Sequence, residues 1–420
     1  MPHRGARASS GRMLIDSYTG VVLDVDGVVV RDRMPIAGAA VAVAGLLGAG
    51  RAVVYATNNA SRSAAEVAEL LAAAGMPAIP EQVVTSAIAA GSLIEPGARC
   101  LVIGTAALRE VLALRGAELT DDPDAADTVV VGLNRDLTWH DLAAATTALR
   151  AGARFLATNA DTTFPSATGI TPGNGATIAF LEAASGRHAE VAGKPEPPLL
   201  QAAADRIQQS AGPGPVLMVG DRHETDIAGA AALGWDTALV LTGVTAAEDV
   251  PGLDPAPTYV LDDLGGLLRP PPPRQPGALL VRTARDDDLD AIVGLWDEAG
   301  MLAYSRDPAG DIRRLRAASP ELMLVAERDR EVVGTLMAAS DGRRGWFHRM
   351  AVTDRARRAG VGRALVRAAE QRLDARGLPG VNLMHFPGDE RAAAFWESMG
   401  YRSTGSPVVL RTGRLPAPRD

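Results

Sequence analysis

Two aspartates stand two residues apart near the start of the chain, at the end of an apolar run. Asp24 and Asp26 occur in the run Val-Leu-Asp-Val-Asp-Gly, and residues 21–25 have the composition of a strand. Because side chains alternate along a strand, the two carboxylates should lie on the same side of it. Carboxylates so close repel each other unless a cation joins them or the two groups have different roles. The pair is therefore a candidate for metal-assisted or acid–base chemistry.

Three further polar clusters follow apolar runs or stand in short loops. They are Thr57-Asn58-Asn59 after residues 52–56, Lys194 in a Gly-Lys-Pro turn, and Asp221 with Asp226 after residues 216–219. Taken singly, each has an ordinary alternative: a solvated turn, a helix N-cap or a surface charge. Together with the first aspartate pair, they predict a magnesium-dependent site for phosphate transfer, with hydroxyl, amide and ammonium groups for the anion and carboxylates for the cation.

Short β-branched runs must position these clusters, and they alternate with Ala/Leu-rich helical stretches. The expected strands are residues 21–25, 52–56, 101–103, 128–131, 155–158, 216–219 and 238–241. Continuous apolar strands separated by helices are typical of a parallel sheet covered on both faces. Ligands of such sheets bind beyond the carboxyl ends of the strands. The first part of the chain is thus predicted to be α/β, with a Rossmann-like parallel sheet.

Length and composition limit the number of domains and the class of protein. The 420 residues suggest two or three domains, and 47% hydrophobic with 22% charged residues is typical of a globular protein. A net charge of −8 argues against non-specific nucleic-acid binding. No apolar stretch is long enough to span a membrane and no secretory signal is recognisable, so we expect a cytoplasmic protein. The single cysteine, Cys100, lies in an apolar run and should be a buried thiol.

A proline-rich segment, residues 269–276, divides the chain. Consecutive prolines fix φ and lack backbone donors, so we expect an extended polyproline II spacer of roughly 25 Å. Such a spacer makes independent motion of the two parts the default expectation.

The four polar clusters resemble the motifs of the haloacid dehalogenase-type phosphatases, in the subclass with a large cap between the second and third motifs. The segments Val-Gly-Leu-Asn-Arg-Asp (residues 131–136) and Ala-Thr-Asn-Ala-Asp (residues 157–161) are similar to cap segments of that subclass. The resemblance covers residues 19–268. It implies a phosphatase core at 19–81 and 190–268, an inserted α/β cap at 82–189, and a disordered tail at 1–18.

The resemblance also implies a role for each acidic residue. Asp24 would be the nucleophile that forms an aspartyl-phosphate, and Asp26 the acid and later the base. Asp24, the backbone carbonyl of Asp26, and Asp221 would hold Mg²⁺. Asp226 would orient Lys194 or the water shell of the metal.

The remaining residues would contact the substrate. Thr57 and Lys194 would bind the transferring phosphoryl oxygens. Substrate-binding roles fall to Asn58 and Asn59 after the second motif and to Arg135, Asn159 and Asp161 of the cap. In the cap, Asn159 and Asp161 suit a hydroxylated leaving group and Arg135 an anionic one. The alternatives are loop-forming residues and a surface ion pair. Relatives with this cap act on small organophosphates, and we favour glycerol 3-phosphate.

Beyond the linker, the pattern changes to strands followed by a glycine-bearing helix start. Strands are expected at residues 279–284, 321–328, 331–338 and 346–352, before the run Arg-Arg-Ala-Gly-Val-Gly-Arg at 357–363. Backbone N–H groups at a helix N-terminus, with arginines nearby, form a plausible cradle for a pyrophosphate. A basic helix with a tight start is the alternative.

This part resembles the GCN5-related N-acetyltransferases over residues 278–412, which implies a C-terminal α+β acetyltransferase-like domain at 277–420. The implied acetyl-CoA contacts are Val352, Arg357, Gly360, Gly362 and Arg363. Trp396 occupies the position at which many members of that family have a tyrosine that protonates the leaving thiolate. Asp389 occupies the position of the asparagine that is usual at the helix start. Tyr401 and His348 are the candidates to replace the tyrosine. Acyl transfer and a CoA-binding or structural module are therefore both open.

Three functional hypotheses follow. The first is a Mg²⁺-dependent phosphomonoesterase with an appended acetyltransferase-like domain, whose partners are a small phosphorylated metabolite and acetyl-CoA, with neither nucleic acid nor membrane. The second makes N-acetyl transfer the principal activity. The third is a CoA-sensing regulatory protein built on a phosphatase scaffold. The intact set of Asp24, Asp26, Thr57, Lys194 and Asp221 favours the first. The oligomeric state stays open.

Overall fold

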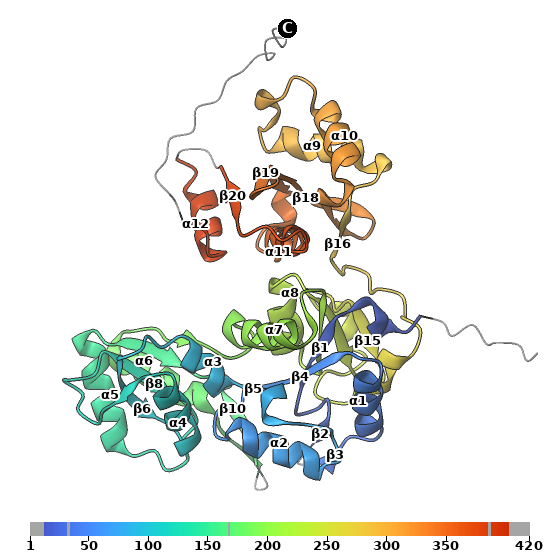
Figure 1. Ribbon diagram of the computed structural model, residues 1–420. Coiled ribbons are helices and arrows are strands. Elements are labelled where there is room, and N and C mark those ends of the chain that lie inside the picture. The colour runs from blue at the N-terminus through green and yellow to red at the C-terminus, as the bar shows by residue number, and fades with distance from the viewer. Residues whose placement is uncertain (1–11, 32–33, 167–168, 385–387, 403–420) are drawn as a thin grey trace, which may run out of the picture. The chain divides into compact units, whose positions relative to one another are not determined.

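A computed structural model describes residues 12–31, 34–166, 169–384 and 388–402 of the chain (Figure 1). The chain forms two compact units, residues 1–280 with 328–330, and residues 281–327 with 331–420. None of the helices within the described ranges is long and apolar enough to cross a membrane.

The first unit is built on a six-stranded sheet in the order β15-β14-β13-β1-β4-β5, and every neighbouring pair is parallel. Its strands are β1 (Gly20–Asp24), β4 (Ala52–Thr57), β5 (Val83–Thr85), β13 (Val216–Gly220), β14 (Asp236–Val240) and β15 (Tyr259–Leu261). The central strand β1 lies between β13 and β4. The predicted Rossmann-like parallel sheet is therefore confirmed.

Helices cover both faces of this sheet, which is why its strands are apolar throughout. They are α1 (Ala39–Gly48), α2 (Ala64–Ala73), α3 (Ser86–Ser92), α7 (Pro197–Ala211) and α8 (Ala228–Ala232). Val21 and Leu23 of β1 lie in the apolar cluster formed with α1 and α2, whereas Val22 lies in the cluster formed with α3, α7 and α8. A two-stranded ribbon, β2 (Val30–Arg31) and β3 (Met34–Pro35), follows β1.

A second parallel sheet is inserted into the first unit between β5 and α7, in the order β12-β9-β8-β6-β7. Its strands are β6 (Arg99–Ile103), β7 (Glu118–Leu119), β8 (Thr128–Val131), β9 (Arg154–Ala157) and β12 (Glu190–Val191). Helices α4 (Ala106–Leu114), α5 (Trp139–Ala151) and α6 (Asn174–Ser185) pack on it, and β10 (Thr163–Ser166) pairs with β11 (Gly169–Pro172). This separate sheet is the predicted α/β cap.

The cap and the core share one apolar cluster around α3. Leu108 and Leu112 of α4 lie in the same buried cluster as Ala87 of α3 and Leu199 of α7. The sole cysteine, Cys100, is buried in this cluster, and burial raises the pKa of its thiol to about 11. The expected buried thiol is confirmed.

The second unit has a five-stranded mixed sheet in the order β16-β17-β18-β19-β20. Its strands are β16 (Leu280–Thr283), β17 (Met323–Arg328), β18 (Glu331–Ser340), β19 (Gly345–Val352) and β20 (Val381–Leu383), and its helices are α9 (Leu289–Glu298), α10 (Pro308–Ala318), α11 (Val361–Asp374) and α12 (Glu390–Ser398). Strand β19 runs antiparallel to β18 and parallel to β20. The predicted α+β class is confirmed, while the domain boundaries stay predictions and residues 403–420 lie outside the described part.

The expectation of a disordered tail at 1–18 is wrong for its last residues. A helical turn at Leu14–Ser17 buries Leu14 and Ile15 completely in the core of the first unit. Two adjacent large apolar side chains were a sufficient signal for burial. Residues 1–11 lie outside the described part of the chain.

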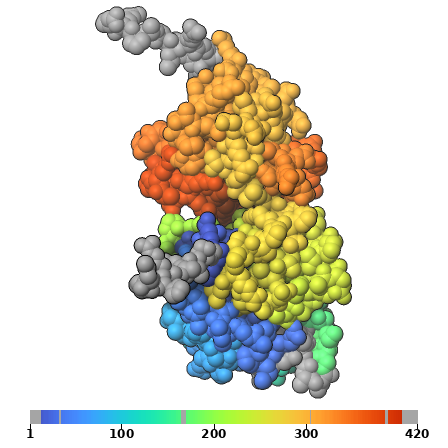
Figure 2. All heavy atoms as spheres, turned by 90° about the vertical axis from the view of Figure 1, so that its right-hand side faces the viewer, coloured from blue at the N-terminus to red at the C-terminus, as the bar shows by residue number. Residues whose placement is uncertain are grey.

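The proline-rich segment contacts the core of the first unit, and its role as an extended spacer stays a prediction. Arg274 forms an ion pair with Asp236 at the start of β14, and the backbone N–H of Gln275 donates to the carbonyl of Thr258 at 3.0 Å. In Figure 2 this yellow part of the chain lies on the surface of the core. Prolines do not prevent docking, since their neighbours supply the missing donors.

Candidate functional site

The site is assembled at the carboxyl ends of the three central strands of the core sheet. Asp24 is the last residue of β1, Thr57 the last of β4, and Asp221 follows β13 directly. Because β1 pairs in parallel with both β13 and β4, these ends meet at one edge. The sequence prediction that these residues converge is consistent with this arrangement.

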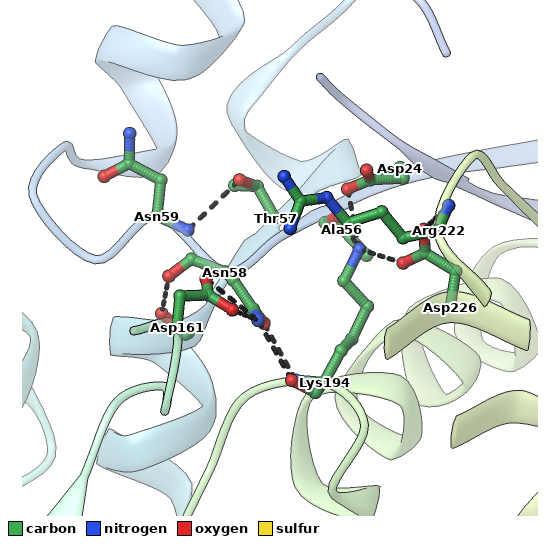
Figure 3. A network of polar contacts seen from close by, with 10 residues as sticks. Asp24, Ala56, Thr57, Asn58, Asn59, Asp161, Lys194, Arg222 and Asp226 are labelled. Carbon is green, nitrogen blue, oxygen red and sulfur yellow. Dashed lines mark hydrogen bonds and ion pairs between the residues drawn. The ribbon is translucent and has the colours of Figure 1, made fainter. Parts of the chain in front are cut away.

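Lys194 is the centre of the polar network in Figure 3. Its side chain is 2% exposed, and its ammonium contacts Asp24 Oδ1 at 2.6 Å, Asp226 Oδ1 at 2.7 Å and the carbonyl oxygen of Ala56 at 3.2 Å. It is the only lysine among 42 basic residues, the other 41 being arginines. That uniqueness is a signal in the sequence that our sequence analysis missed.

Two carboxylates contact this single ammonium, and a third, Asp221, lies beside them. One oxygen from each of Asp24, Asp221 and Asp226 lies within 4.8 Å of the others. Burial raises the pKa of Asp24 well above its usual range, Lys194 opposes that shift, and the other two carboxylates add to it. Burial would lower the pKa of Lys194, but Asp226 and Asp24 outweigh it and raise that pKa. The cluster therefore carries more negative charge than its ammonium neutralises.

The loop after β1 packs directly on Asp221. Gly27 has φ +83°, and a Cβ on it would lie 2.2 Å from Oδ2 of Asp221, so only glycine allows this approach. The same Oδ2 accepts a hydrogen bond from the backbone N–H of Val244 at 2.7 Å. These contacts fix one carboxylate oxygen of Asp221.

A π-helical turn at His223–Ile227 places Asp226 in the carboxylate cluster. The N–H groups of Asp226 and Ile227 both donate to the carbonyl of Arg222, at 3.1 and 3.3 Å. Asp226 Oδ2 in turn accepts from the backbone N–H of Arg222 at 3.2 Å. Both oxygens of this fully buried carboxylate are thus held by the protein.

Asp26 lies outside this carboxylate cluster. Strand β1 ends at Asp24, and Asp26 is an exposed residue in an isolated bridge to Val30. Because β1 ends at Asp24, the argument from strand alternation does not extend to Asp26. The acid–base role of Asp26 stays a prediction.

The two asparagines after Thr57 are both engaged by the protein. Asn59 accepts from the N–H and the hydroxyl of Ser61 at 2.8 and 2.6 Å, and its own N–H donates to Thr57 Oγ1 at 3.1 Å. The side chain of Asn58 bonds to the backbone of Lys194 and to Asp161 (Figure 3). The substrate-binding roles of Asn58 and Asn59 stay predictions, because the contacts described are all within the protein.

The predicted cap residues divide into two places. Asn159 and Asp161 follow β9 and meet the core at Asn58, whereas Arg135 is exposed in the loop after β8. Asn159 is 5% exposed, and its amide donates to the carbonyl of Asn58 at 2.8 Å. Burial raises the pKa of Asp161, while Asn58 and Arg222 oppose the shift.

Arg222 is a candidate that our sequence analysis quoted but did not interpret. It is exposed, follows Asp221 directly, and extends its guanidinium toward Thr57 in Figure 3. Its charge acts both on Asp221 in the core and on Asp161 in the cap. The Gly-Asp-Arg sequence after an apolar strand was the available signal.

The second unit has a glycine turn at the start of α11. Gly360 is its N-cap in the left-handed region, and Arg358 also has positive φ, 62°. Nearby, β19 has an irregularity, because Thr335 pairs with Ala351 whereas Met337 pairs with His348. Of the other predicted CoA contacts, Val352 ends β19, Arg357 pairs with Asp354, and Gly362 and Arg363 lie in the first turn of α11.

The residues considered as acids in this unit have structural contacts. Trp396 is 8% exposed and packs against Phe347 and Tyr401, with ring centroids 6.1 and 5.2 Å apart. The Tyr401 hydroxyl donates to Glu370 at 2.7 Å, and burial and this carboxylate raise its pKa. Burial and Arg349 lower the pKa of His348. Trp396 and Tyr401 are thus parts of an aromatic cluster.

Comparison with known proteins decides the family. Residues 21–118 match the haloacid dehalogenase-like hydrolase family and residues 191–267 a HAD-hydrolase-like family. A D-glycerol 3-phosphate phosphatase from Mycobacterium tuberculosis is 43% identical over 263 residues, which are 61% of this chain and 72% of that protein. The chain belongs to the haloacid dehalogenase-like hydrolases. It is a phosphatase of that family, and residues 289–401 match the acetyltransferase (GNAT) family.

Other members of the hydrolase family support this assignment. An acid sugar phosphatase from Staphylococcus haemolyticus is 36% identical, over 59% of this chain and 94% of that protein. The crystal structure of a glycerol phosphate phosphatase from Mycobacterium tuberculosis in complex with magnesium has a TM-score of 0.58 at 30% identity, covering 92% of this chain and 98% of that one. A p-nitrophenyl phosphatase from Archaeoglobus fulgidus, with a TM-score of 0.56 at 31% identity, covers 60% of this chain and 98% of that one.

Proposed function

We propose that the first unit is a Mg²⁺-dependent phosphomonoesterase for small polyol phosphates, with glycerol 3-phosphate as the preferred substrate. The observation that supports this proposal most directly is the buried Lys194 ammonium between Asp24 and Asp226 at the carboxyl ends of the central strands. The 43% identical relative named for D-glycerol 3-phosphate supports the choice of substrate.

In this mechanism Asp24 attacks phosphorus in line, and the phosphoryl group moves from the substrate oxygen to the carboxylate, giving an aspartyl-phosphate. Asp26 gives a proton to the departing alkoxide and then takes one from the water that attacks the aspartyl-phosphate. Thr57 and Lys194 donate to the phosphoryl oxygens on which charge accumulates. Asp226 holds the Lys194 ammonium at 2.7 Å, beside the nucleophile.

The cluster of carboxylates fits a bound Mg²⁺. Three acidic oxygens within 4.8 Å around one ammonium are hard ligands with excess negative charge. Both oxygens of Asp226 are engaged by the protein, so Asp24, Asp221 and the backbone carbonyl of Asp26 would be the ligands, with Asp226 beyond them. When bound, Mg²⁺ neutralises the phosphate and the nucleophile and so lowers their mutual repulsion.

A panel of phosphate esters tests the choice of substrate. Asp161 lies on the cap side of the site, beside Asn58 and the carboxylate cluster, so a neutral hydroxylated leaving group is favoured over a carboxylated one. We expect kcat/KM for glycerol 3-phosphate to exceed that for 2-phosphoglycolate by at least about tenfold, or about 1.4 kcal/mol. The measurement is phosphate release with Mg²⁺ across both compounds, a hexose phosphate and a nucleoside monophosphate. A preference for 2-phosphoglycolate would overturn the proposal.

For the second unit we propose acetyl-CoA binding at the N-terminus of α11. The observations that favour it are the left-handed Gly360 at the N-cap of a 14-residue helix and the family match over residues 289–401. Free N–H groups of the first turn bind a pyrophosphate, and the positive end of the helix dipole adds to the attraction. Burial of Trp396 in the aromatic cluster favours binding over acyl transfer by that residue.

Calorimetry with acetyl-CoA tests this second proposal. We expect measurable binding at millimolar ligand and a loss of at least about tenfold in affinity for Gly362→Glu, since a carboxylate in the first turn of α11 repels a pyrophosphate. The matched control is Ala309→Glu, which places the same charge in the first turn of α10 and should bind like wild type. Absence of heat with the wild-type protein, or equal binding by Gly362→Glu, contradicts the proposal.

A further inference from the structure

Asn58 touches both chain segments that connect the core to the cap. Its backbone carbonyl accepts a hydrogen bond from the hydroxyl of Ser86 at 2.6 Å, where α3 begins and the chain leaves the core. Its side chain bonds to Lys194, where the chain returns from β12. A single residue after the strand β4 therefore spans the whole junction.

The contact with Lys194 is a two-point clamp on the backbone. Asn58 Oδ1 accepts from the N–H of Lys194 at 2.8 Å, and Asn58 Nδ2 donates to its carbonyl oxygen at 3.0 Å. The approach is close, because a Cβ on Gly193 would lie 2.7 Å from Asn58 Oδ1. Two opposed hydrogen bonds fix both the position and the orientation of the backbone from which the Lys194 side chain extends.

The same asparagine is held from the cap. Asp161 accepts from Asn58 Nδ2 at 3.4 Å to each carboxylate oxygen, and Asn159 Nδ2 donates to the carbonyl of Asn58 at 2.8 Å. Asn159 is itself fixed, because its Oδ1 accepts from the N–H of Asp161 at 3.2 Å. In Figure 3 the side chain of Asp161 lies beside Asn58, while Lys194 extends away from it to Asp24.

We infer that Asn58 is a positioning residue that makes the place of the Lys194 ammonium depend on the seating of the cap. This inference rests on the proposed function, and it replaces the expected contact of the Asn58 side chain with substrate. The amide has two donors and one acceptor group, and Lys194 and Asp161 use all of its polar atoms. Displacement of the cap would withdraw Asp161 from the clamp, and Lys194 would lose its fixed backbone.

The test combines an activity readout with one that needs no activity. We expect Asn58→Ala to lower kcat for glycerol 3-phosphate by about 10- to 100-fold while KM changes less than about threefold, because the ammonium acts mainly in the transition state. Amide hydrogen exchange should rise in the peptide that contains residues 190–198. Gln209→Ala, which removes an exposed amide from α7, is the matched control and should change neither.

A charge exchange across the junction separates positioning from general damage. Asn58→Asp places a carboxylate against Asp161, so exchange at 190–198 should rise and kcat should fall at least as far as in Asn58→Ala. Adding Asp161→Asn removes the repulsion between the two carboxylates and supplies an amide donor to the new aspartate. The double variant should therefore recover at least about fivefold in kcat and part of the protection against hydrogen exchange at 190–198. Asp161→Asn alone should cost less than either Asn58 variant.

Failure of the inference about Asn58 can be distinguished from failure of the proposed phosphatase function. If wild type releases no phosphate from any ester, the proposed function fails, and the exchange data alone judge the clamp. Exchange and kcat in Asn58→Ala equal to those of Gln209→Ala overturn the inference. So does a double variant that shows the sum of the two single defects, since that result denies any contact across the junction.

Discussion

Phosphate release is expected to stop when Asp24 is replaced by asparagine. The side chains have the same shape, so the fold should persist, but an amide cannot form the aspartyl-phosphate and carries no charge for a cation. We expect kcat/KM to fall at least about 1,000-fold, which corresponds to about 4 kcal/mol of lost transition-state stabilisation. The measurement is inorganic phosphate released from glycerol 3-phosphate in the presence of Mg²⁺.

Two controls accompany this substitution. Asp124→Asn makes the same chemical change at an exposed residue in the turn between β7 and β8, and it should leave the rate unchanged. Chelation of divalent cations should stop wild-type turnover, and added Mg²⁺ should restore it, because the carboxylate cluster needs a cation to admit a phosphate. Turnover that persists in Asp24→Asn or in the chelator would disprove the mechanism.

The second large effect is expected for Lys194→Met, on both activity and stability. The substitution leaves the partly exposed Asp24 and the fully buried Asp226 without their ammonium. Breaking a buried pair from one side costs about 3 kcal/mol or more in the free energy of unfolding. We expect this loss in urea unfolding without divalent cations, together with a fall of at least about 1,000-fold in kcat/KM.

Two further measurements identify the cause. Mg²⁺ should stabilise Lys194→Met more than wild type, because a cation that binds the folded cluster replaces the missing positive charge. The double variant Lys194→Met/Asp226→Asn should regain stability, since the fully buried Asp226 carboxylate is removed with its partner, but it should stay inactive. A single variant as stable as wild type would show that the network contributes nothing to folding.

The core strands could be predicted from the sequence because each is a continuous apolar run buried on both faces. The strands expected at 21–25 and 128–131 were placed within about one residue, since both faces of each strand meet helices. The short strands β5, β12 and β15 have two or three residues each and no distinctive pattern. Their pairing depends on neighbours far away in the chain, which no local pattern reports.

The site was predictable in its members but only partly in its geometry. Asp24, Thr57 and Asp221 each follow an apolar strand, and the rule for parallel sheets brings such ends together. The ion pair of Lys194 with Asp226 depends on a π-helical turn that nothing in the local composition announces. The position of Asp26 could not be derived in the same way, because β1 ends at Asp24 and side-chain alternation applies only within a strand.

The contacts of the linker could not be predicted from its own residues. Four prolines in a row favour an extended chain, and Arg274, which follows them, pairs with Asp236 of the core. The partner of such a charge lies elsewhere in the fold, where no local pattern reports it. Asp236 also accepts a hydrogen bond from the hydroxyl of Tyr18 at 2.6 Å, so one carboxylate joins the segment before β1 to the linker.

The solitary lysine gives this protein its own internal probe. A sample grown on lysine labelled with ¹⁵N at its side-chain nitrogen contains one labelled ammonium group, and that group lies between Asp24 and Asp226. Its burial shields the protons from rapid exchange with water, which is the condition for observing them by magnetic resonance. A single resonance would then follow cation binding, phosphorylation of the neighbouring carboxylate and cap movement in turn, without any assignment of the remaining spectrum.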